Sequence, residues 1–165
     1  HQDCLTGLYN RFKIQQLIEE ALRQAPVGKS MTLAVMDIDN FKQINDAYGH
    51  DCGDETLRRT AAEIRALFAP EDLVGRIGGD EYAGVLKYEK EDHGRDFRNR
   101  IHQAFQDFNR TSEKAYNVTV SVEMYLMEAE EDLTLHDALS HADASLYEAK
   151  KNRVKSVAKN FDHNN

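Results

Sequence analysis

The sequence predicts an α+β fold: a central, mainly antiparallel β-sheet with a split β-α-β-β-α-β core, flanked by helices. Residues 31–38 form a short, nearly continuous apolar run, which is typical of a buried central strand. Residues 73–77 and 81–87 are short strand-like runs on either side of Gly-Gly-Asp, which is typical of a β-hairpin. Amphipathic segments separate these strands, so the order from residue 31 onward is β-α-β-β-α-β-α, the split βαβ pattern.

A first helix is predicted at residues 11–25, ahead of that core. Asn10 is suited to cap its N-terminus, and Pro26 with Gly28 ends it. Its apolar residues recur at helical spacing and are expected on one face: Phe12, Leu17, Ile18, Ala21 and Leu22.

The remaining elements follow from the same two periods. Helical spacing predicts helices at 53–70, 94–109 and 134–152. Residues 116–127 alternate between apolar and polar, as a half-buried strand does. One face of that strand is expected to hold Val118, Val120, Val122, Met124 and Leu126. Residues 153–165 are expected to add a short edge strand and then fray.

The composition suits one globular domain, which we expect to span residues 1–165. Hydrophobic residues make up 41% and charged residues 30% of the chain, which is enough apolar content to bury a core. The formal net charge is −8, which argues against nucleic-acid binding because that requires a basic surface. The charge does not exclude small anionic ligands, which need only a local positive site.

The cysteines and the hydropathy indicate the compartment. Cys4 and Cys52 are too few for a disulfide framework and form no CxxC motif, so a reducing cytoplasm is expected. No apolar run reaches the ~20 residues of a membrane-spanning helix, so no membrane contact by this domain is expected. The chain starts without Met, and we expect it to come from the C-terminal part of a longer protein, which could itself be membrane-anchored.

Two acidic features are expected to meet at one edge of the sheet. Asp37 and Asp39 end the buried strand, and Asp80 lies at the tip of a hairpin whose second strand can neighbour it. Mg²⁺ in proteins takes one or two carboxylates plus substrate phosphates. Each feature alone has a simpler interpretation. An Asp after a strand often just starts a turn, and Gly-Gly hairpin turns with solvent-exposed acids are common. Together they favour a metal site.

Gly78 and Gly79 directly precede the hairpin acids. Glycine adopts positive φ without a steric cost, so a tight turn with φ > 0 is expected at this pair. The absence of side chains is also expected to let a ligand approach the backbone there.

Several blocks together resemble one protein family. The run GGDEY at 78–82 resembles the signature of the GGDEF family, the diguanylate cyclases, with Tyr82 in place of the usual Phe. The blocks at 3–11, 36–57 and 142–152 resemble the family's entry, metal-and-guanine and C-terminal helix motifs, in the same order. The resemblance spans the chain and implies a fold similar to nucleotidyl cyclase and polymerase palm domains.

The resemblance implies an activity and a metal. The family joins two GTP molecules into cyclic di-GMP and releases pyrophosphate, with two protomers face to face as a homodimer driven by an upstream sensor domain. It implies that Asp37 and Asp80 hold Mg²⁺ (or Mn²⁺) by their side chains, with the carbonyl of Ile38. Glu81 would complete the metal site or help to activate the attacking 3′-hydroxyl.

The resemblance also implies how GTP is bound. Asn45 and Asp54 match the family's guanine-reading pair, although a turn or cap for Asn45 and a helix N-cap for Asp54 are simpler interpretations. The implied phosphate contacts come from Lys42, Lys150 and the backbone amides near Asn40 and Phe41. Gly78 and Gly79 would let the triphosphate approach the signature.

The sequence departs from the family pattern at four places. Val154 stands where the family has a phosphate-binding Arg, which would weaken GTP affinity or turnover. Ala69 replaces the Arg of an Arg-x-x-Asp pair that ends at Asp72, so no strong inhibition by the product is expected there. Tyr82 needs a partner for its hydroxyl, and Glu123 stands where Gly is usual.

The alternative function is a degenerate GGDEF module, which binds GTP or cyclic di-GMP as a regulatory or interaction domain with little or no catalysis. Val154 favours this alternative, whereas the retained Asp80 and Glu81 favour the enzyme.

Overall fold

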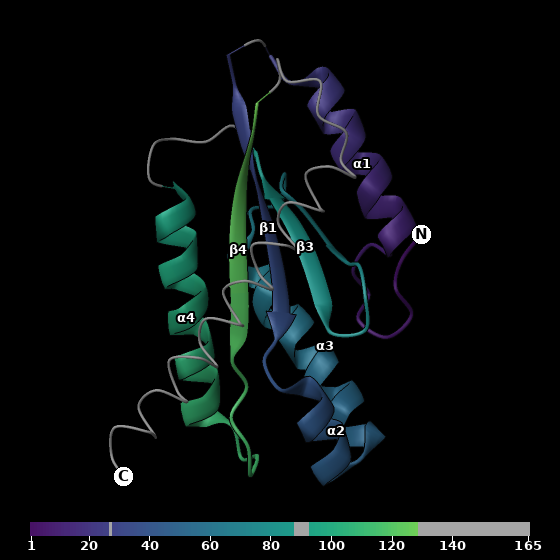
Figure 1. Ribbon diagram of the computed structural model, residues 1–165, viewed down its shortest axis with the longest axis vertical. Coiled ribbons are helices and arrows are strands. Elements are labelled where there is room, and N and C mark those ends of the chain that lie inside the picture. The colour runs from purple at the N-terminus through teal and green to yellow at the C-terminus, as the bar shows by residue number, and fades with distance from the viewer. Residues whose placement is uncertain (27, 88–92, 129–165) are drawn as a thin grey trace, which may run out of the picture.

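The computed structural model describes residues 1–26, 28–87 and 93–128 (Figure 1). The predicted helix at 134–152, the predicted edge strand, Lys150 and Val154 lie outside the described residues.

The described strands form one antiparallel sheet, which confirms the predicted fold class. They are β1 (Ser30–Ile38), β2 (Leu73–Arg76), β3 (Glu81–Leu86) and β4 (Val120–Glu128), in the order β2-β3-β1-β4. Every neighbouring pair is antiparallel. The hairpin's second strand, β3, therefore lies beside β1, as the split βαβ pattern predicts.

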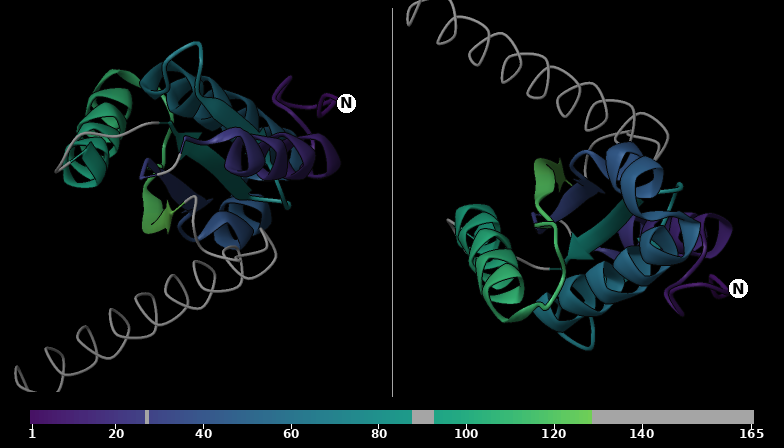
Figure 2. Two further views of the ribbon diagram at one scale, coloured as in Figure 1. Left: turned by 90° about the horizontal axis from the view of Figure 1, so that it is seen from above. Right: turned by 90° about the horizontal axis from the view of Figure 1, so that it is seen from below.

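Helices cover both faces of this sheet. They are α1 (Arg11–Gln24), α2 (Phe41–Tyr48), α3 (His50–Leu67) and α4 (His93–Thr111). Apolar residues of α3 and α4 share one core with one face of the sheet, while α1 packs on a second core over the other face. Figure 2 looks along the strands and shows α4 and α1 on opposite sides of the molecule.

The first helix begins as predicted but buries a different residue. Asn10 caps it, because its side chain accepts a hydrogen bond of 2.8 Å from the Lys13 amide. Phe12 was expected on the buried face and is 73% exposed, whereas Ile14 is buried. Residues two apart on a helix point in nearly opposite directions, so the stripe through Ile14 and Ile18 excludes Phe12.

The segment after β1 holds a helix that the sequence did not predict. Helix α2 buries only Ile44, so its apolar spacing gives little signal. Gly49, at φ 91°, separates it from α3. Since α3 begins at His50 and not at residue 53, Asp54 lies inside the helix, and the N-cap interpretation of Asp54 is wrong.

The last described strand is shorter than predicted. It begins at Val120, and Val118 lies before it, buried and fixed by two hydrogen bonds between its backbone and the Asn109 side chain. Leu126 was expected to be buried and is half exposed, at 51%. Figure 1 shows that β4 extends past the first turn of α4.

Candidate functional site

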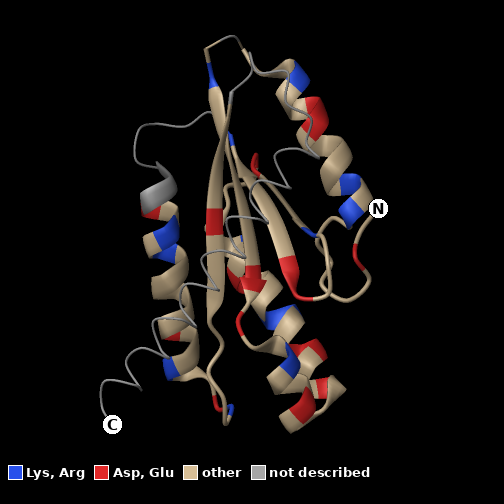
Figure 3. Ribbon diagram, viewed as in Figure 1, with Lys and Arg blue, Asp and Glu red and all other residues tan. Residues whose placement is uncertain are grey.

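The acidic end of β1 lies against the start of β3. In the strand register, Asp37 is opposite Glu81, and the Ile38 amide donates to the Asp80 carbonyl at 3.2 Å. Figure 3 shows the acidic positions at these neighbouring strand ends. The Asp37 side chain is half-buried, and its Oδ1 is shielded from solvent. The predicted meeting of the two acidic segments is therefore found.

Residues 77–81, called the signature turn below, connect β2 to β3. The amides of Ile77 and Gly78 both donate to the Glu81 carbonyl, at 2.9 and 3.3 Å. The predicted positive φ at Gly78 and Gly79 is wrong, since neither residue has it. Two-residue hairpin turns require positive φ, and this connection is longer, so ordinary backbone angles close it.

The two glycines of the turn differ in their surroundings. A Cβ at Gly78 would lie 3.3 Å from the Glu81 Cβ, so the absent side chain allows Glu81 to pack closely. A Cβ at Gly79 would meet nothing within 4 Å. Gly79 thus borders open space beside the acidic residues.

Oxygen atoms dominate this end of the sheet. Carboxylates of Asp37, Asp80 and Glu81 and the carbonyl of Ile38 are hard donors, the kind that Mg²⁺ prefers. Within the described residues, no group of three or more His, Cys, Asp or Glu side chains is arranged to hold an ion. In proteins, Mg²⁺ usually takes one or two carboxylates and completes its shell with water or phosphate oxygens.

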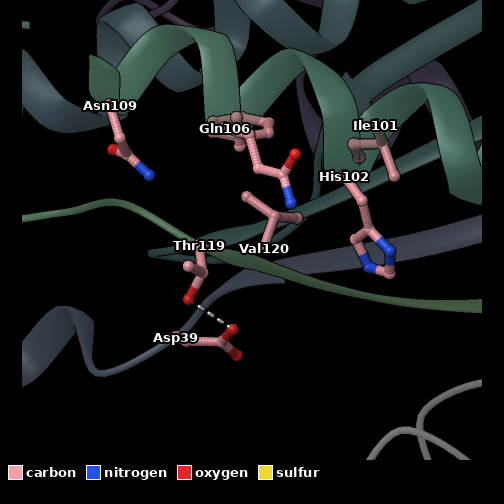
Figure 4. A pocket seen from close by; sticks show the side chains of 8 residues that line it. Asp39, Ile101, His102, Gln106, Asn109, Thr119 and Val120 are labelled. Carbon is pink, nitrogen blue, oxygen red and sulfur yellow. Dashed lines mark hydrogen bonds between the residues drawn. The ribbon is translucent and has the colours of Figure 1, made fainter.

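Asp39, the second acid after β1, contacts a different strand. Its carboxylate accepts hydrogen bonds from the hydroxyls of Thr119, at 2.8 Å, and Ser121, while its amide donates to the Thr119 carbonyl. Figure 4 shows it at the edge of a cavity of about 290 Å³. The cavity is lined by Asp39, Ile101, His102, Phe105, Gln106, Asn109, Thr119 and Val120. Asp39 therefore fastens the end of β1 to β4.

The predicted base-reading residues lie on consecutive helices, Asn45 on α2 and Asp54 on α3. Gly53 brings these helices together, because a Cβ at this position would overlap Oδ1 of Asn45. The Asn45 side chain therefore rests on the turn of α3 that carries Asp54. Sequence reasoning missed Gly53, although a glycine inside a helix is a signal of close packing.

A loop before β4 covers this pair of helices. The Tyr116 hydroxyl is 2.8 Å from Oγ1 of Thr56, and its ring lies 4.6 Å from that of Tyr48. The Lys114 ammonium donates to Glu55 at 2.6 Å, a hydrogen bond that lowers the pKa of the Glu55 carboxyl. No pattern in the sequence predicts these contacts.

Three of the predicted phosphate contacts lie at the start of α2, whereas Lys150 lies outside the described residues. Asn40 adopts a left-handed conformation with φ 57°, Phe41 is the first helical residue, and Lys42 is exposed. The first amides of a helix have no partner inside it and favour anions. The structure brings Asn40, Phe41 and Lys42 to one helix end, directly after the acidic end of β1.

The hydroxyl that Tyr82 adds to the signature, where the family usually has Phe, has a hydrogen-bond partner. Tyr82 is fully buried, and its hydroxyl donates to the Leu57 carbonyl on α3 at 2.8 Å. Burial raises the pKa of this hydroxyl. This hydrogen bond joins β3 to α3, the helix that carries Asp54.

Two other departures, Ala69 and Glu123, also have structural partners, and that of Ala69 is the retained Asp72. The two carboxylate oxygens of Asp72 accept hydrogen bonds from backbone amides, one from Ala69 at 2.9 Å and the other from Lys87 at 3.1 Å. Asp72 thereby fixes the turn between α3 and β2. Glu123 forms an ion pair of 4.0 Å with Arg98 of α4.

Comparison with protein families assigns the chain to one of them. The family model described as "Diguanylate cyclase, GGDEF domain" matches residues 1–156. The chain therefore belongs to the GGDEF family of diguanylate cyclase domains.

Individual relatives agree with this assignment. The chain is 35% identical over 155 residues to diguanylate cyclase DgcS of Shewanella oneidensis, covering 90% of this chain and 49% of that protein. It is 34% identical over 152 residues to diguanylate cyclase DgcP of Pseudomonas aeruginosa, covering 90% of this chain and 22% of that protein. The chain thus spans half or less of these relatives.

Solved structures share the fold. Diguanylate cyclase SiaD of Pseudomonas aeruginosa, in complex with its activator SiaC, matches with a TM-score of 0.82 and 31% identity, covering 92% of this chain and 58% of that one. The coiled coil and GGDEF domain of Caulobacter crescentus DgcB, in complex with c-di-GMP, matches with a TM-score of 0.77 and 28% identity, covering 92% of this chain and 81% of that one.

None of the helices in the described ranges is both long and apolar enough to cross a membrane.

Proposed function

We propose that this domain joins two GTP molecules into cyclic di-GMP and releases pyrophosphate, as a homodimer that depends on Mg²⁺ or Mn²⁺. The observation that supports this most is the register in which Asp37 lies opposite Glu81 and the Ile38 amide binds the Asp80 carbonyl. This register gathers acidic oxygens beside the helices that carry the base-reading residues. Family membership supplies the class of reaction.

The proposed metal ligands are Asp37, Asp80 and the Ile38 carbonyl, with Glu81 beside them. A bound divalent ion would neutralise triphosphate charge and polarise the reacting phosphate. Glu81 completes the ligand set or accepts the proton of the attacking 3′-hydroxyl. That hydroxyl oxygen forms a bond to the α-phosphorus while the bond to the pyrophosphate group breaks.

Guanine is selected by Asn45 and Asp54. The Asp54 carboxylate accepts from the N1–H and the N2 amine of guanine, a pair of donors that adenine lacks. Adenine would leave the carboxylate unpaired in a half-buried site, and such unpaired groups give strong discrimination. Phosphates are bound by Lys42, Lys150 and the amides near Asn40 and Phe41, with Gly78 and Gly79 leaving the backbone approachable.

The reaction requires two copies of the domain. Each protomer binds one GTP, and each 3′-hydroxyl attacks the α-phosphate held by the partner, so a lone monomer is inactive. We propose that an upstream sensor domain of a longer cytoplasmic or membrane-anchored protein brings the copies together.

The test is product formation by the dimerised protein. It is incubated with GTP and Mg²⁺, and cyclic di-GMP is measured by chromatography beside Asp80→Ala. We expect product from the wild type and none from the variant. If GTP binds but no product forms at high protein concentration, the regulatory alternative is correct. If ATP competes as well as GTP, the roles of Asn45 and Asp54 are wrong.

A further inference from the structure

The N-terminal segment, residues 2–11, is bound along β2 just before the signature turn. Tyr9 pairs with Gly75 as in a parallel strand, and the Arg76 amide donates to the Tyr9 carbonyl at 2.9 Å. A Cβ at Gly75 would lie 2.8 Å from the Tyr9 carbonyl, so a glycine is needed for this approach. The Arg11 guanidinium donates to the Ile77 carbonyl at 3.1 Å. Three successive residues thus contact the N-terminal segment, and the last of them, Ile77, begins the turn.

The Arg76 side chain joins this segment to the turn itself. Its Nε and Nη2 both donate to the Gly79 carbonyl, at 3.0 and 2.8 Å. Its Nη1 donates to both carboxylate oxygens of Asp3, at 3.1 and 3.2 Å. One edge of the guanidinium therefore holds the turn while the remaining nitrogen holds Asp3.

Asp3 is fixed in turn by its own neighbours. The Thr6 amide and hydroxyl donate to its Oδ2 at 2.8 and 2.7 Å. Burial by itself would raise the pKa of the Asp3 carboxyl, but hydrogen bonds from Thr6 and Arg76 hold it below the usual value. The side chains of Arg76 and Asp3 are only 17% and 20% exposed, so solvent screens this pair less than a surface pair.

These contacts restrain the backbone on both sides of Asp80. The peptide before it carries the Gly79 carbonyl, which is bound by Arg76. The peptide after it carries the Asp80 carbonyl, which accepts from the Ile38 amide on β1. A residue whose two flanking peptides are fixed has its side chain directed by them. Loss of the Arg76 contacts would leave β1 as the remaining one of these two restraints.

We infer that Arg76 is a positioning residue for the signature turn, and that Asp3 of the N-terminal segment holds Arg76 in place. The docking of residues 2–11 thereby sets the placement of Asp80 and Glu81. The inference rests on the proposed function for its kinetic consequence alone. The GTP-binding residues on α2 and α3 make none of these contacts, so KM and kcat are expected to respond differently.

The first test is steady-state kinetics of the dimerised protein. Arg76→Ala is expected to lower kcat about tenfold or more while KM for GTP stays within about twofold. Asp3→Asn is expected to lower kcat less. Arg76→Lys should restore only part of the loss, because one ammonium cannot reproduce the two-sided guanidinium contact. The double variant Asp3→Asn/Arg76→Ala should lose no more than Arg76→Ala, since the two residues act through one contact.

The second test does not require catalysis. Amide hydrogen exchange in residues 77–82 is expected to speed up in Arg76→Ala and Asp3→Asn. Arg110→Ala is the matched control, because Arg110 forms an exposed ion pair with Asp107 on α4 and contacts nothing in the turn. Its kcat and its exchange in residues 77–82 should equal those of the wild type.

Specific outcomes overturn the inference. Folded Arg76→Ala and Asp3→Asn with wild-type kcat, a loss that appears in KM alone, or unchanged exchange in the turn would each contradict it. If Arg76→Ala does not fold, Asp3→Asn and Arg76→Lys decide. If the wild type makes no cyclic di-GMP, the proposed function fails, and hydrogen exchange still decides whether Arg76 positions the turn.

Discussion

The signature turn and the α2–α3 pair are held by different kinds of contact. The turn depends on β1 and on the N-terminal segment, which lie far from it in the chain. In the α2–α3 pair, Asn45 is packed by two neighbours in sequence, Gly49 and Gly53, although the loop before β4 also contacts both helices. The acids proposed for the chemistry thus rely on long-range contacts, whereas Asn45, proposed to read the base, is placed mainly by local ones. Substitutions in the two regions should separate turnover from GTP affinity.

The largest effect is expected at the acidic end of β3. Asp80→Ala removes a proposed metal ligand and should lower cyclic di-GMP formation by about 10³-fold or more, because electrostatic stabilisation of a reacting phosphate is a dominant contribution to rate. Guanine contacts remain, so binding of GTP should persist in calorimetry. Asp107→Ala on α4 is the control and should keep full activity. Wild-type turnover in Asp80→Ala would remove this residue from the mechanism.

The next effect tests the local packing of the other region. Gly53→Ala should push the Asn45 side chain away and raise KM for GTP by about tenfold, the cost of one well-placed hydrogen bond. It should also destabilise the protein by about 1–3 kcal/mol through overpacking, measured by urea unfolding. Alanine inside a helix normally stabilises by roughly 1 kcal/mol relative to glycine, so the sign is diagnostic.

Gly79→Ala is the stability control for that substitution, because its Cβ would enter open space. Its free energy of unfolding should stay within about 0.5 kcal/mol of the wild type. A more stable Gly53→Ala with an unchanged KM would show that Asn45 does not need this glycine.

A smaller effect tests the bond that connects the two regions. Tyr82→Phe removes the hydroxyl that donates to the Leu57 carbonyl and should cost about 1 kcal/mol of unfolding free energy. Phe is the usual residue of the family at this position, so we expect the fold to be retained. Tyr9→Phe, on a ring that is 37% exposed, is the matched control. Equal stability of both variants would mean that the buried bond contributes nothing net.

The smallest effect is the pH dependence of the Asp3–Arg76 pair. The pKa of Asp3 is lowered in the folded state, so its contribution to stability is complete above its unfolded pKa of about 3.9 and is lost as pH falls through the folded value. The stability difference between wild type and Asp3→Asn should therefore be constant from about pH 8 to 5 and shrink below about pH 4. A difference that shrinks near neutral pH would contradict this assignment.

Much of the fold could be predicted because it depends on periodic patterns. The apolar run at 31–38 and the hairpin around Gly78 determine which strands are neighbours, and this brought Asp37 to the signature. Helix α2 escaped prediction because only Ile44 is buried on it. The predicted positive φ at Gly78 and Gly79 was wrong because the connection between β2 and β3 is longer than a two-residue turn and does not need it.

Individual side-chain partners could not be predicted from the sequence. Arg76 and Asp3 are ordinary charged residues when read along the chain, and their contact exists only because the N-terminal segment packs on β2. The partner of Tyr82 is a helix carbonyl, which any residue supplies. Such contacts are set by the packing of whole elements, and no spacing in the sequence encodes them.

The packing of residues 2–11 on β2 also couples the local opening of this segment to that of the signature turn. Segments of a folded protein open locally with free energies below that of global unfolding. Local opening of residues 2–11 must break the Arg76 contacts to Asp3 or to Gly79, so it would loosen the signature turn with it. The lifetime of the ordered turn is then limited by the stability of a segment that lies far from it in the sequence. Any partner that holds residues 2–11 in place would prolong that lifetime without touching the site.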